Sequence, residues 1–141
     1  MRARLIPAAV TALAAGQLSL GIPAAGATPV ITTIPEVQAP SGQTVFTDNS
    51  AVVDPHPQSI DSWSRVAETD SSIAVHFTTG TPECFGVTAE VQETVDIVAV
   101  KLRGGTRPEA LDRACIMLAV FGTLTVPLSA PVGDRAVVSI T

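Results

Sequence analysis

The sequence predicts an all-β domain, a small antiparallel sandwich or partly closed barrel of about six strands with one short helix. From residue 59 onward, apolar and polar residues alternate with a period of two, as in strands that bury one face. Short stretches rich in Gly, Pro, Asp and Thr separate these runs and are typical of turns. About 114 residues follow the N-terminal segment described next, a length that suits one domain with one core.

Residues 1–27 have the three parts of a cleavable secretory signal peptide. Arg2 and Arg4 form the basic part, residues 5–20 are mostly apolar, and Ala25-Gly26-Ala27 offers small residues before a cut at Thr28. A cut one to three residues earlier would also satisfy the rule. Proline and glycine interrupt the apolar stretch, so it is unsuited to the helix of about 20 apolar residues that spans a membrane. No cysteine lies near the cut, so we expect release without a lipid anchor.

The acidic net charge of the chain disfavours partners that carry phosphate groups. The full sequence has a net charge of −5, from eight basic and thirteen acidic residues. Loss of the two arginines of the signal leaves six basic residues, so the mature net charge is −7. Because each phosphate contact needs a cation, we expect no nucleic-acid partner. Later apolar runs, such as residues 114–121, are too short to span a bilayer, so we expect no membrane insertion after signal cleavage. The expected partner is a protein or cell-wall component that the sequence does not identify.

Residues 28–58 are expected to form a Pro-rich extended leader, and residues 59–141 a β-rich globular domain. Five prolines recur in the leader among Ser, Thr, Gln and Gly, a composition that disfavours a packed core. Only residues 45–47 and 51–53 have enough apolar character to add short edge strands to the domain.

Four strands are expected in the first part of the domain, where the alternation is most regular. They cover residues 62–68, 73–78, 87–92 and 98–103. The link at residues 93–96 is short enough to join the last two as a hairpin.

Thr106 and Glu109 are spaced as in a capping box, in which each side chain bonds the backbone N–H of the other residue. This spacing predicts a short helix that ends near Ala114. A proline and glycine turn at residues 131–134 and a closing strand at residues 135–140 complete the chain. Asp134 and Arg135 are expected to form a local ion pair there.

Residues 116–128 fit two patterns. Apolar side chains at every second position favour a strand that is bulged or bent near Gly122. Apolar residues at helical spacing, from Leu111 to Phe121, would instead continue the helix through Val120. We favour the strand.

Cys84 and Cys115 are the two cysteines of the chain and are expected to form a disulfide. In the chain-entropy estimate, closing a loop of this length stabilises the fold by roughly 3–4 kcal/mol. The alternative is a catalytic or metal-binding thiol, which an oxidising compartment disfavours.

Enzymatic signatures are not found: the sequence has no G-x-S-x-G, H-E-x-x-H, C-x-x-C or phosphate-binding glycine loop. We therefore expect no enzyme, cofactor or metal site. Asp54 and His56 could share a cation, but the prolines beside His56 also suit a structural role. His76 is expected on the polar face of its strand, where Glu90 or Asp61 would have to join it to make a general base.

A possible binding surface is expected at Trp63, His76 and Phe85. The chain has only five aromatic residues, whereas protein-binding hot spots usually display several Trp and Tyr side chains. Trp63 therefore has a second interpretation, as a core residue beneath the sheet.

Six parts of the chain together form a distinctive pattern: residues 54–57, Trp63, residues 75–87, residues 102–106, residues 114–117 and residues 131–135. This pattern resembles a family of small secreted actinobacterial proteins with two cysteines. The resemblance implies an extracytoplasmic location and paired cysteines, and it implies no catalytic residue, cofactor or substrate.

The sequence thus favours a secreted, non-catalytic structural or binding module of the cell envelope or extracellular space. One alternative is a small secreted protease inhibitor whose contact loop lies around residues 81–85, beside Cys84. The other alternative is a hydrolase without a recognisable motif, because catalytic triads are assembled in space and not in sequence.

Overall fold

The computed structural model describes Gly21 and residues 26–141. Most of the predicted signal peptide lies outside these residues, so its interpretation stays a prediction. Within the described part, no helix is long and apolar enough to cross a membrane.

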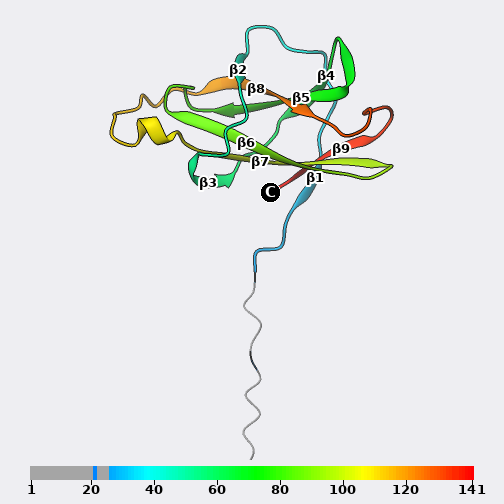
Figure 1. Ribbon diagram of the computed structural model, residues 1–141, viewed down its shortest axis with the longest axis horizontal. Coiled ribbons are helices and arrows are strands. Elements are labelled where there is room, and N and C mark those ends of the chain that lie inside the picture. Colours follow the sequence, from blue (N-terminus) through cyan, green and yellow to red (C-terminus); the bar gives the residue numbers. More distant parts are fainter. Residues whose placement is uncertain (1–20, 22–25) are drawn as a thin grey trace, which may run out of the picture.

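The described residues form a β-sandwich of two sheets that lie one above the other (Figure 1). One sheet has the order β1-β9-β7-β3, in which β9 and β3 pair with opposite ends of β7, and β6 pairs along the length of β7. The second sheet has the order β2-β8-β5-β4. The predicted all-β sandwich is confirmed. The strands are β1 Ile31–Thr33, β2 Thr44–Phe46, β3 Val53–Pro57, β4 Ser62–Val66, β5 Thr69–Thr79, β6 Phe85–Glu93, β7 Ile97–Thr106, β8 Val120–Pro127 and β9 Ala136–Ile140.

Most neighbouring strands are antiparallel, but two pairs are parallel. The predicted hairpin is present, because β6 and β7 pair antiparallel from Phe85↔Thr106 to Glu93↔Val98. In contrast, β2 runs parallel to β8, and β9 runs parallel to β7. Both parallel pairs join strands that are distant in sequence, because a short hairpin turn makes neighbouring strands antiparallel and parallel strands need a longer connection.

The core lies between the sheets and consists of alternate residues of the strands, as the period of two predicts. Trp63 belongs to this core and is 4% exposed. Its interpretation as a core residue is therefore correct. The buried cluster comprises Ile34, Phe46, Trp63, Ile73, Val75, Phe77, Val87, Val98, Val100, Leu102, Leu124, Val126, Val132 and Val137.

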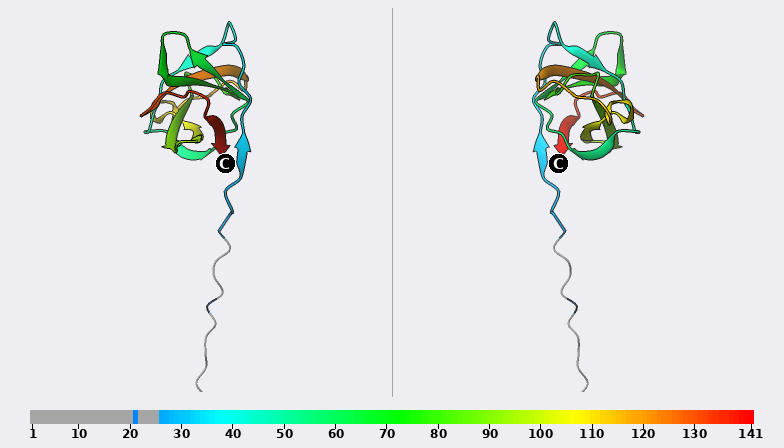
Figure 2. Two further views of the ribbon diagram at one scale, coloured as in Figure 1. Left: turned by 90° about the vertical axis from the view of Figure 1, so that its right-hand side faces the viewer. Right: turned by 90° about the vertical axis from the view of Figure 1, so that its left-hand side faces the viewer.

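The predicted leader is part of the folded domain and not a tether. Its strand β1 pairs with β9, so the C-terminus lies beside β1 (Figure 2). Further along the leader, β2 joins the second sheet and β3 joins the first. Ile34 and Phe46 contribute to the core. Prolines are compatible with this arrangement because edge positions and bends leave a backbone nitrogen without a required hydrogen bond.

The strand predicted around Gly122 is found as β8, but the bulge is not. The register of β8 with β5 runs without a shift from Thr79↔Val120 to Ser72↔Pro127. Close packing explains why residue 122 is a glycine: a Cβ at this position would lie 2.7 Å from the ring of Phe77 and 2.8 Å from the ring of Phe46. These two rings pack together with centroids 5.5 Å apart and need the space.

The predicted helix after residue 106 is reduced to a single 3-10 turn, η1, at Pro108–Ala110. Its N-cap is Arg107, which has no side-chain cap, so the capping box expected from Thr106 and Glu109 is wrong. The turn buries only Ala110. The apolar residues that follow, such as Leu111 and Leu118, are exposed, so a longer helix would have no core to pack its apolar face against.

Candidate functional site

The disulfide between Cys84 and Cys115 is formed, as predicted, with Cα atoms 6.0 Å apart. Cys84 is buried directly before β6. Cys115 lies in the segment between η1 and β8, in which residues 114–119 have no regular secondary structure. The bond therefore holds this segment against the end of the first sheet.

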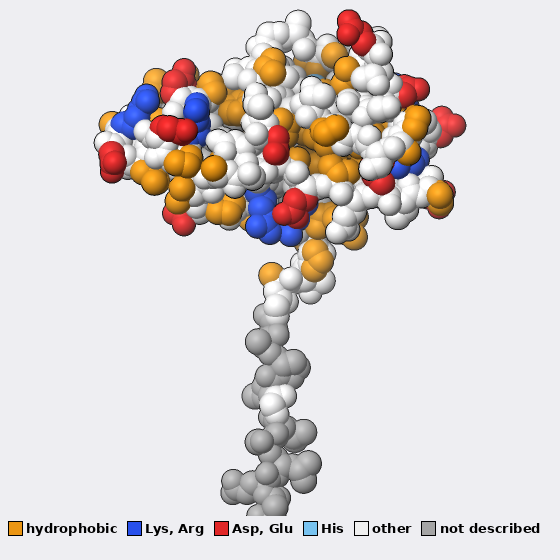
Figure 3. All heavy atoms as spheres, viewed as in Figure 1, with side chains coloured by type: hydrophobic (Ala, Val, Ile, Leu, Met, Phe, Trp, Pro, Cys, Tyr) orange, Lys and Arg blue, Asp and Glu red, His pale blue; other side chains and the backbone are white. Residues whose placement is uncertain are grey.

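The tethered segment carries large apolar side chains that are exposed. Met117 is 95% exposed, and its neighbours Ile116 and Leu118 are more than half exposed, as is Leu111. At this end of the molecule, hydrophobic side chains lie among acidic and basic ones (Figure 3). We call residues 111–119 the apolar loop. Because monomeric proteins rarely expose contiguous large apolar groups, the apolar loop is the candidate contact surface of the described residues.

A hollow of about 380 Å³ lies beneath the apolar loop. Residues 116–119 form one wall, and Thr78, Thr79, Gly80 and Phe85 form the other. The Phe85 ring lies over Gly80 at a place where any side chain at that position would overlap it. Phe85 is therefore the one member of the predicted binding surface that the structure places at this end.

The other two members of that surface, Trp63 and His76, are each 4% exposed, so they form no surface. Trp63 faces the core, and its ring lies 5.5 Å from the guanidinium carbon of Arg65. The expectation that His76 lies on a wet face is also wrong. The segment with Pro40, Gly42 and Gln43 passes over that part of the second sheet and encloses a hollow lined by His76.

Ser64 Oγ and His76 Nε2 are 2.8 Å apart and share a hydrogen bond. Neither predicted carboxylate completes a catalytic arrangement. Asp61 accepts a hydrogen bond from Thr78 instead, and Glu90 lies on β6 in the other sheet. Among the described residues, none hydrogen-bonds His76 Nδ1. Ser64 is 1% exposed, so a substrate carbonyl does not reach it without opening of the fold.

Sequence reasoning missed Ser64. Ser64 directly follows Trp63 in β4, and successive side chains of a strand point to opposite faces. A core position for Trp63 therefore places Ser64 on the opposite face of β4. That face would be open to solvent if the chain around Pro40 did not cross it, and no local pattern predicts the crossing.

Burial of His76 lowers the pKa of its imidazole below the ordinary value of 6.5. The unfolded chain therefore takes up a proton at a higher pH than the folded domain does. We expect the free energy of unfolding to be fully retained above pH 6.5 and to fall as the pH drops below it. Urea unfolding of the wild type and of His76→Gln between pH 8 and pH 5 measures this effect. The variant should show a flatter pH dependence, and an equal slope in both proteins would contradict the expectation.

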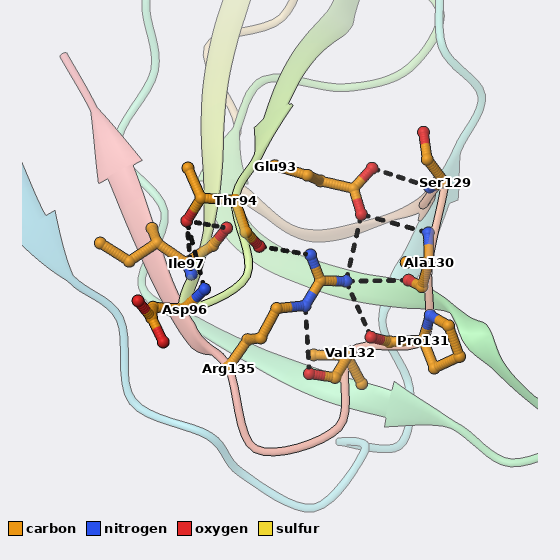
Figure 4. Close-up of polar contacts among 9 residues, drawn as sticks. All are labelled: Glu93, Thr94, Asp96, Ile97, Ser129, Ala130, Pro131, Val132 and Arg135. Atoms are coloured by element: carbon orange, nitrogen blue, oxygen red, sulfur yellow. Dashed lines mark hydrogen bonds and ion pairs between the residues drawn. The ribbon is translucent and has the colours of Figure 1, made fainter.

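Arg135 forms an ion pair with Glu93, not with Asp134 as predicted (Figure 4). Arg135 Nη2 lies 3.1 Å from Glu93 Oε1, and the side chains are 10% and 16% exposed. The guanidinium also donates to the backbone carbonyls of Thr94, Ala130, Pro131 and Val132.

Glu93 in turn holds the loop between β8 and β9. Its carboxylate accepts hydrogen bonds from the backbone N–H groups of Ser129 at 2.7 Å and Ala130 at 3.3 Å. The hydrogen bond from Ser129, assisted by that from Arg135, lowers the pKa of Glu93 below its ordinary value of 4.5. Because these polar groups are directed at one another, the Arg135–Glu93 cluster joins the β6–β7 turn to the loop before β9 and has a structural role.

The second predicted position for chemistry, His56, lies exposed on β3. Its Nδ1 is 3.3 Å from the carbonyl oxygen of Asp54. In the part of the chain that the structure describes, no group of three or more His, Cys, Asp or Glu residues is placed to hold a metal ion.

The fold and the site define a disulfide-linked β-sandwich that exposes an apolar loop at one end. Comparison with protein-family models, curated proteins and solved structures gives no match. The resemblance to secreted actinobacterial proteins therefore stays a prediction.

Proposed function

We propose that this protein is an exported, non-catalytic binding module of the cell envelope or extracellular space, and that its apolar loop contacts the partner. The observation that carries the proposal is the exposure of Ile116, Met117 and Leu118 beside a disulfide. Exposed apolar side chains in a free chain are covered when a partner binds. The disulfide reduces the entropy lost when such a loop becomes ordered in a complex.

The polar groups inside the domain support a non-catalytic role. Ser64 and His76 bond each other beneath the crossing segment, and neither is open to a substrate. Arg135 and Glu93 use their hydrogen-bonding groups to hold two turns together. Catalytic side chains, in contrast, need groups directed at a substrate in an accessible pocket.

The disulfide is consistent with an extracytoplasmic location, since such bonds persist in oxidising compartments. Together with the predicted signal peptide, it supports export. A cell-wall or extracellular partner is the corresponding proposal.

The proposal is tested by capture of partners from culture supernatant and cell-wall fractions with immobilised mature protein, residues 28–141. Met117→Asp places a charge in the apolar loop and should abolish capture. Val95→Asp is the matched control, because Val95 is 89% exposed in the β6–β7 turn, at the far end of β7 from the loop. It should capture the same partner as the wild type.

Two results would overturn the proposal. One is a partner that binds Met117→Asp as well as the wild type. The other is turnover on a panel of hydrolase substrates that disappears in Ser64→Ala, because a buried structural serine has no effect on turnover.

A further inference from the structure

We propose that residues 115–119 bind, in the manner of a substrate, to extracellular serine endopeptidases that have an apolar primary pocket, and so inhibit them. This inference rests on the proposed binding function and names the class of partner. Three independent features of the segment carry it: its unpaired backbone, the side chain at its centre and its attachment at both ends.

The backbone of the segment is available for pairing. Among the loop hydrogen bonds of the described residues, none uses a backbone N–H or C=O of residues 114–119. Strand β8 begins only at Val120, where pairing with β5 starts. A segment with free backbone groups can take up strand pairing with a partner, and substrate clefts of endopeptidases bind peptides by such backbone pairing.

The central side chain fits an apolar pocket. Met117 is 95% exposed, whereas Ile116 and Leu118 on either side are 59% and 55% exposed. Its unbranched, flexible chain adapts to pockets of irregular shape. In serine endopeptidases the shape and charge of the primary pocket select the substrate side chain, and a hydrophobic slot accepts apolar ones. We therefore assign Met117 to that pocket and the bond between Met117 and Leu118 to the protease nucleophile.

The segment is attached within two residues on each side of this bond. Cys115 lies two residues before Met117 and is bonded to the buried Cys84. Val120 lies two residues after Leu118 and begins a strand paired on both sides, with β2 and β5. Such attachment reduces the ordering cost on binding, which is how rigid loops gain affinity.

Attachment also limits the effect of slow cleavage. Hydrolysis of the Met117–Leu118 bond consumes one water and leaves a carboxylate on Met117 and an ammonium on Leu118. The new C-terminal fragment would stay in place, because β8 and β9 remain paired with β5 and β7. A cleaved molecule would thus continue to occupy the protease.

This proposed contact lies on the other side of the disulfide from residues 81–85, the loop that the protease-inhibitor alternative named. Residues 81–85 form a tight turn in which the N–H groups of Cys84 and Phe85 both donate to the carbonyl of Thr81. Cys84 is 3% exposed. The exposed side chain of this turn is that of Glu83, whose negative charge does not suit an apolar pocket.

The test is titration of chymotrypsin, subtilisin and trypsin with the disulfide-bonded mature protein. We expect competitive inhibition of one or both of the first two enzymes, which accept apolar side chains, and none of trypsin, which requires a basic one. Met117→Asp should weaken inhibition by at least about 100-fold, as loss of a central contact residue does. Met117→Lys should transfer inhibition to trypsin, and Val95→Asp should inhibit like the wild type. The exposure of Met117 leaves the fold of these variants intact, which thermal melting verifies.

Several outcomes would overturn the inference. Two are the absence of inhibition of both apolar-specific enzymes and rapid degradation of the whole chain. A third is a dimer, found by sedimentation, that Met117→Asp dissociates, since the loop would then bind a second copy of the chain. If capture yields a partner that is no protease and that Met117→Asp loses, the inference fails while the proposed binding function stands. If no Met117-dependent partner is captured, both fail.

Discussion

Arg135→Ala is expected to lower the free energy of unfolding by roughly 1–3 kcal/mol, the cost of leaving largely enclosed hydrogen-bond acceptors without their donor. The side chain is 10% exposed, and its removal leaves the Glu93 carboxylate without its cation. It also leaves four carbonyl groups without the donor they share. These carbonyls belong to Thr94, Ala130, Pro131 and Val132.

The effect should depend on the fork shape of the guanidinium as well as on its charge. Arg135→Lys keeps the charge but has one nitrogen in place of three, so it cannot reach acceptors on both turns at once. We expect it to recover only a small part of the lost stability. Because hydrogen bonds lower the pKa of Glu93, its contribution is present above pH 4.5 and is lost as the pH falls below that value. The difference between wild type and Arg135→Ala should therefore shrink in acid.

Urea unfolding followed by tryptophan fluorescence measures these differences. Trp63 is the single tryptophan of the chain and lies in the core between the sheets, so its emission reports loss of the whole sandwich. Arg113→Ala is the matched control, because Arg113 is exposed and should change stability by less than about 0.5 kcal/mol. Equal unfolding midpoints for Arg135→Ala and Arg113→Ala would show that the Arg135–Glu93 cluster has no stabilising role.

The central strands could be predicted from sequence because their pattern is local. Alternation between Ile73 and Phe77, and again from Val98 to Leu102, marks the faces that the structure buries. The edges could not be predicted in the same way. The pairing of β1 with β9 joins residues at the two ends of the described chain, and no local pattern specifies such a contact. Proline-rich composition favoured a leader, although prolines are also compatible with sheet edges.

The candidate site shows the same division between local and long-range information. The disulfide was predictable because the chain has two cysteines and a predicted signal peptide, which would export it to an oxidising compartment. The exposure of Ile116 and Leu118 was not, because both lie in phase with the apolar stripe of β8. Pairing of β8 with β5 stops at Thr79↔Val120, since β5 ends there and the chain turns away at Gly80. The same stripe is therefore buried after Val120 and exposed before it.

Long-range contacts also explain the two polar groups that sequence analysis misplaced. His76 is buried by a segment more than thirty residues before it, around Pro40. The partner of Arg135 is Glu93, 42 residues away, and not the adjacent Asp134. In both cases the nearest chemically suitable neighbour in sequence was a poor guide, because the two sheets bring distant turns together.

Removal of the disulfide should have two separable effects, on stability and on binding. Cys84→Ala combined with Cys115→Ser opens a loop whose ends are 31 residues apart. The chain-entropy estimate gives a loss of roughly 3–4 kcal/mol in the free energy of unfolding. Neither cysteine lies within a strand, so the paired sheets should survive and the far-UV circular dichroism should stay unchanged. An unaltered unfolding midpoint would contradict the stability prediction.

The second effect concerns the apolar loop. Without the bond, residues 111–119 are held by η1 on one side and by β8 on the other, so the free protein samples many loop conformations. A partner must then order the loop when it binds, and each side chain that becomes fixed costs about 0.5–1.5 kcal/mol. For Ile116, Met117 and Leu118 together, this predicts binding at least about tenfold weaker at a temperature where both proteins are fully folded. Met117→Asp separates the two effects, because it should abolish binding while the unfolding midpoint stays that of the wild type. If the double cysteine variant bound as tightly as the wild type, the disulfide would stabilise the fold without preorganising the loop.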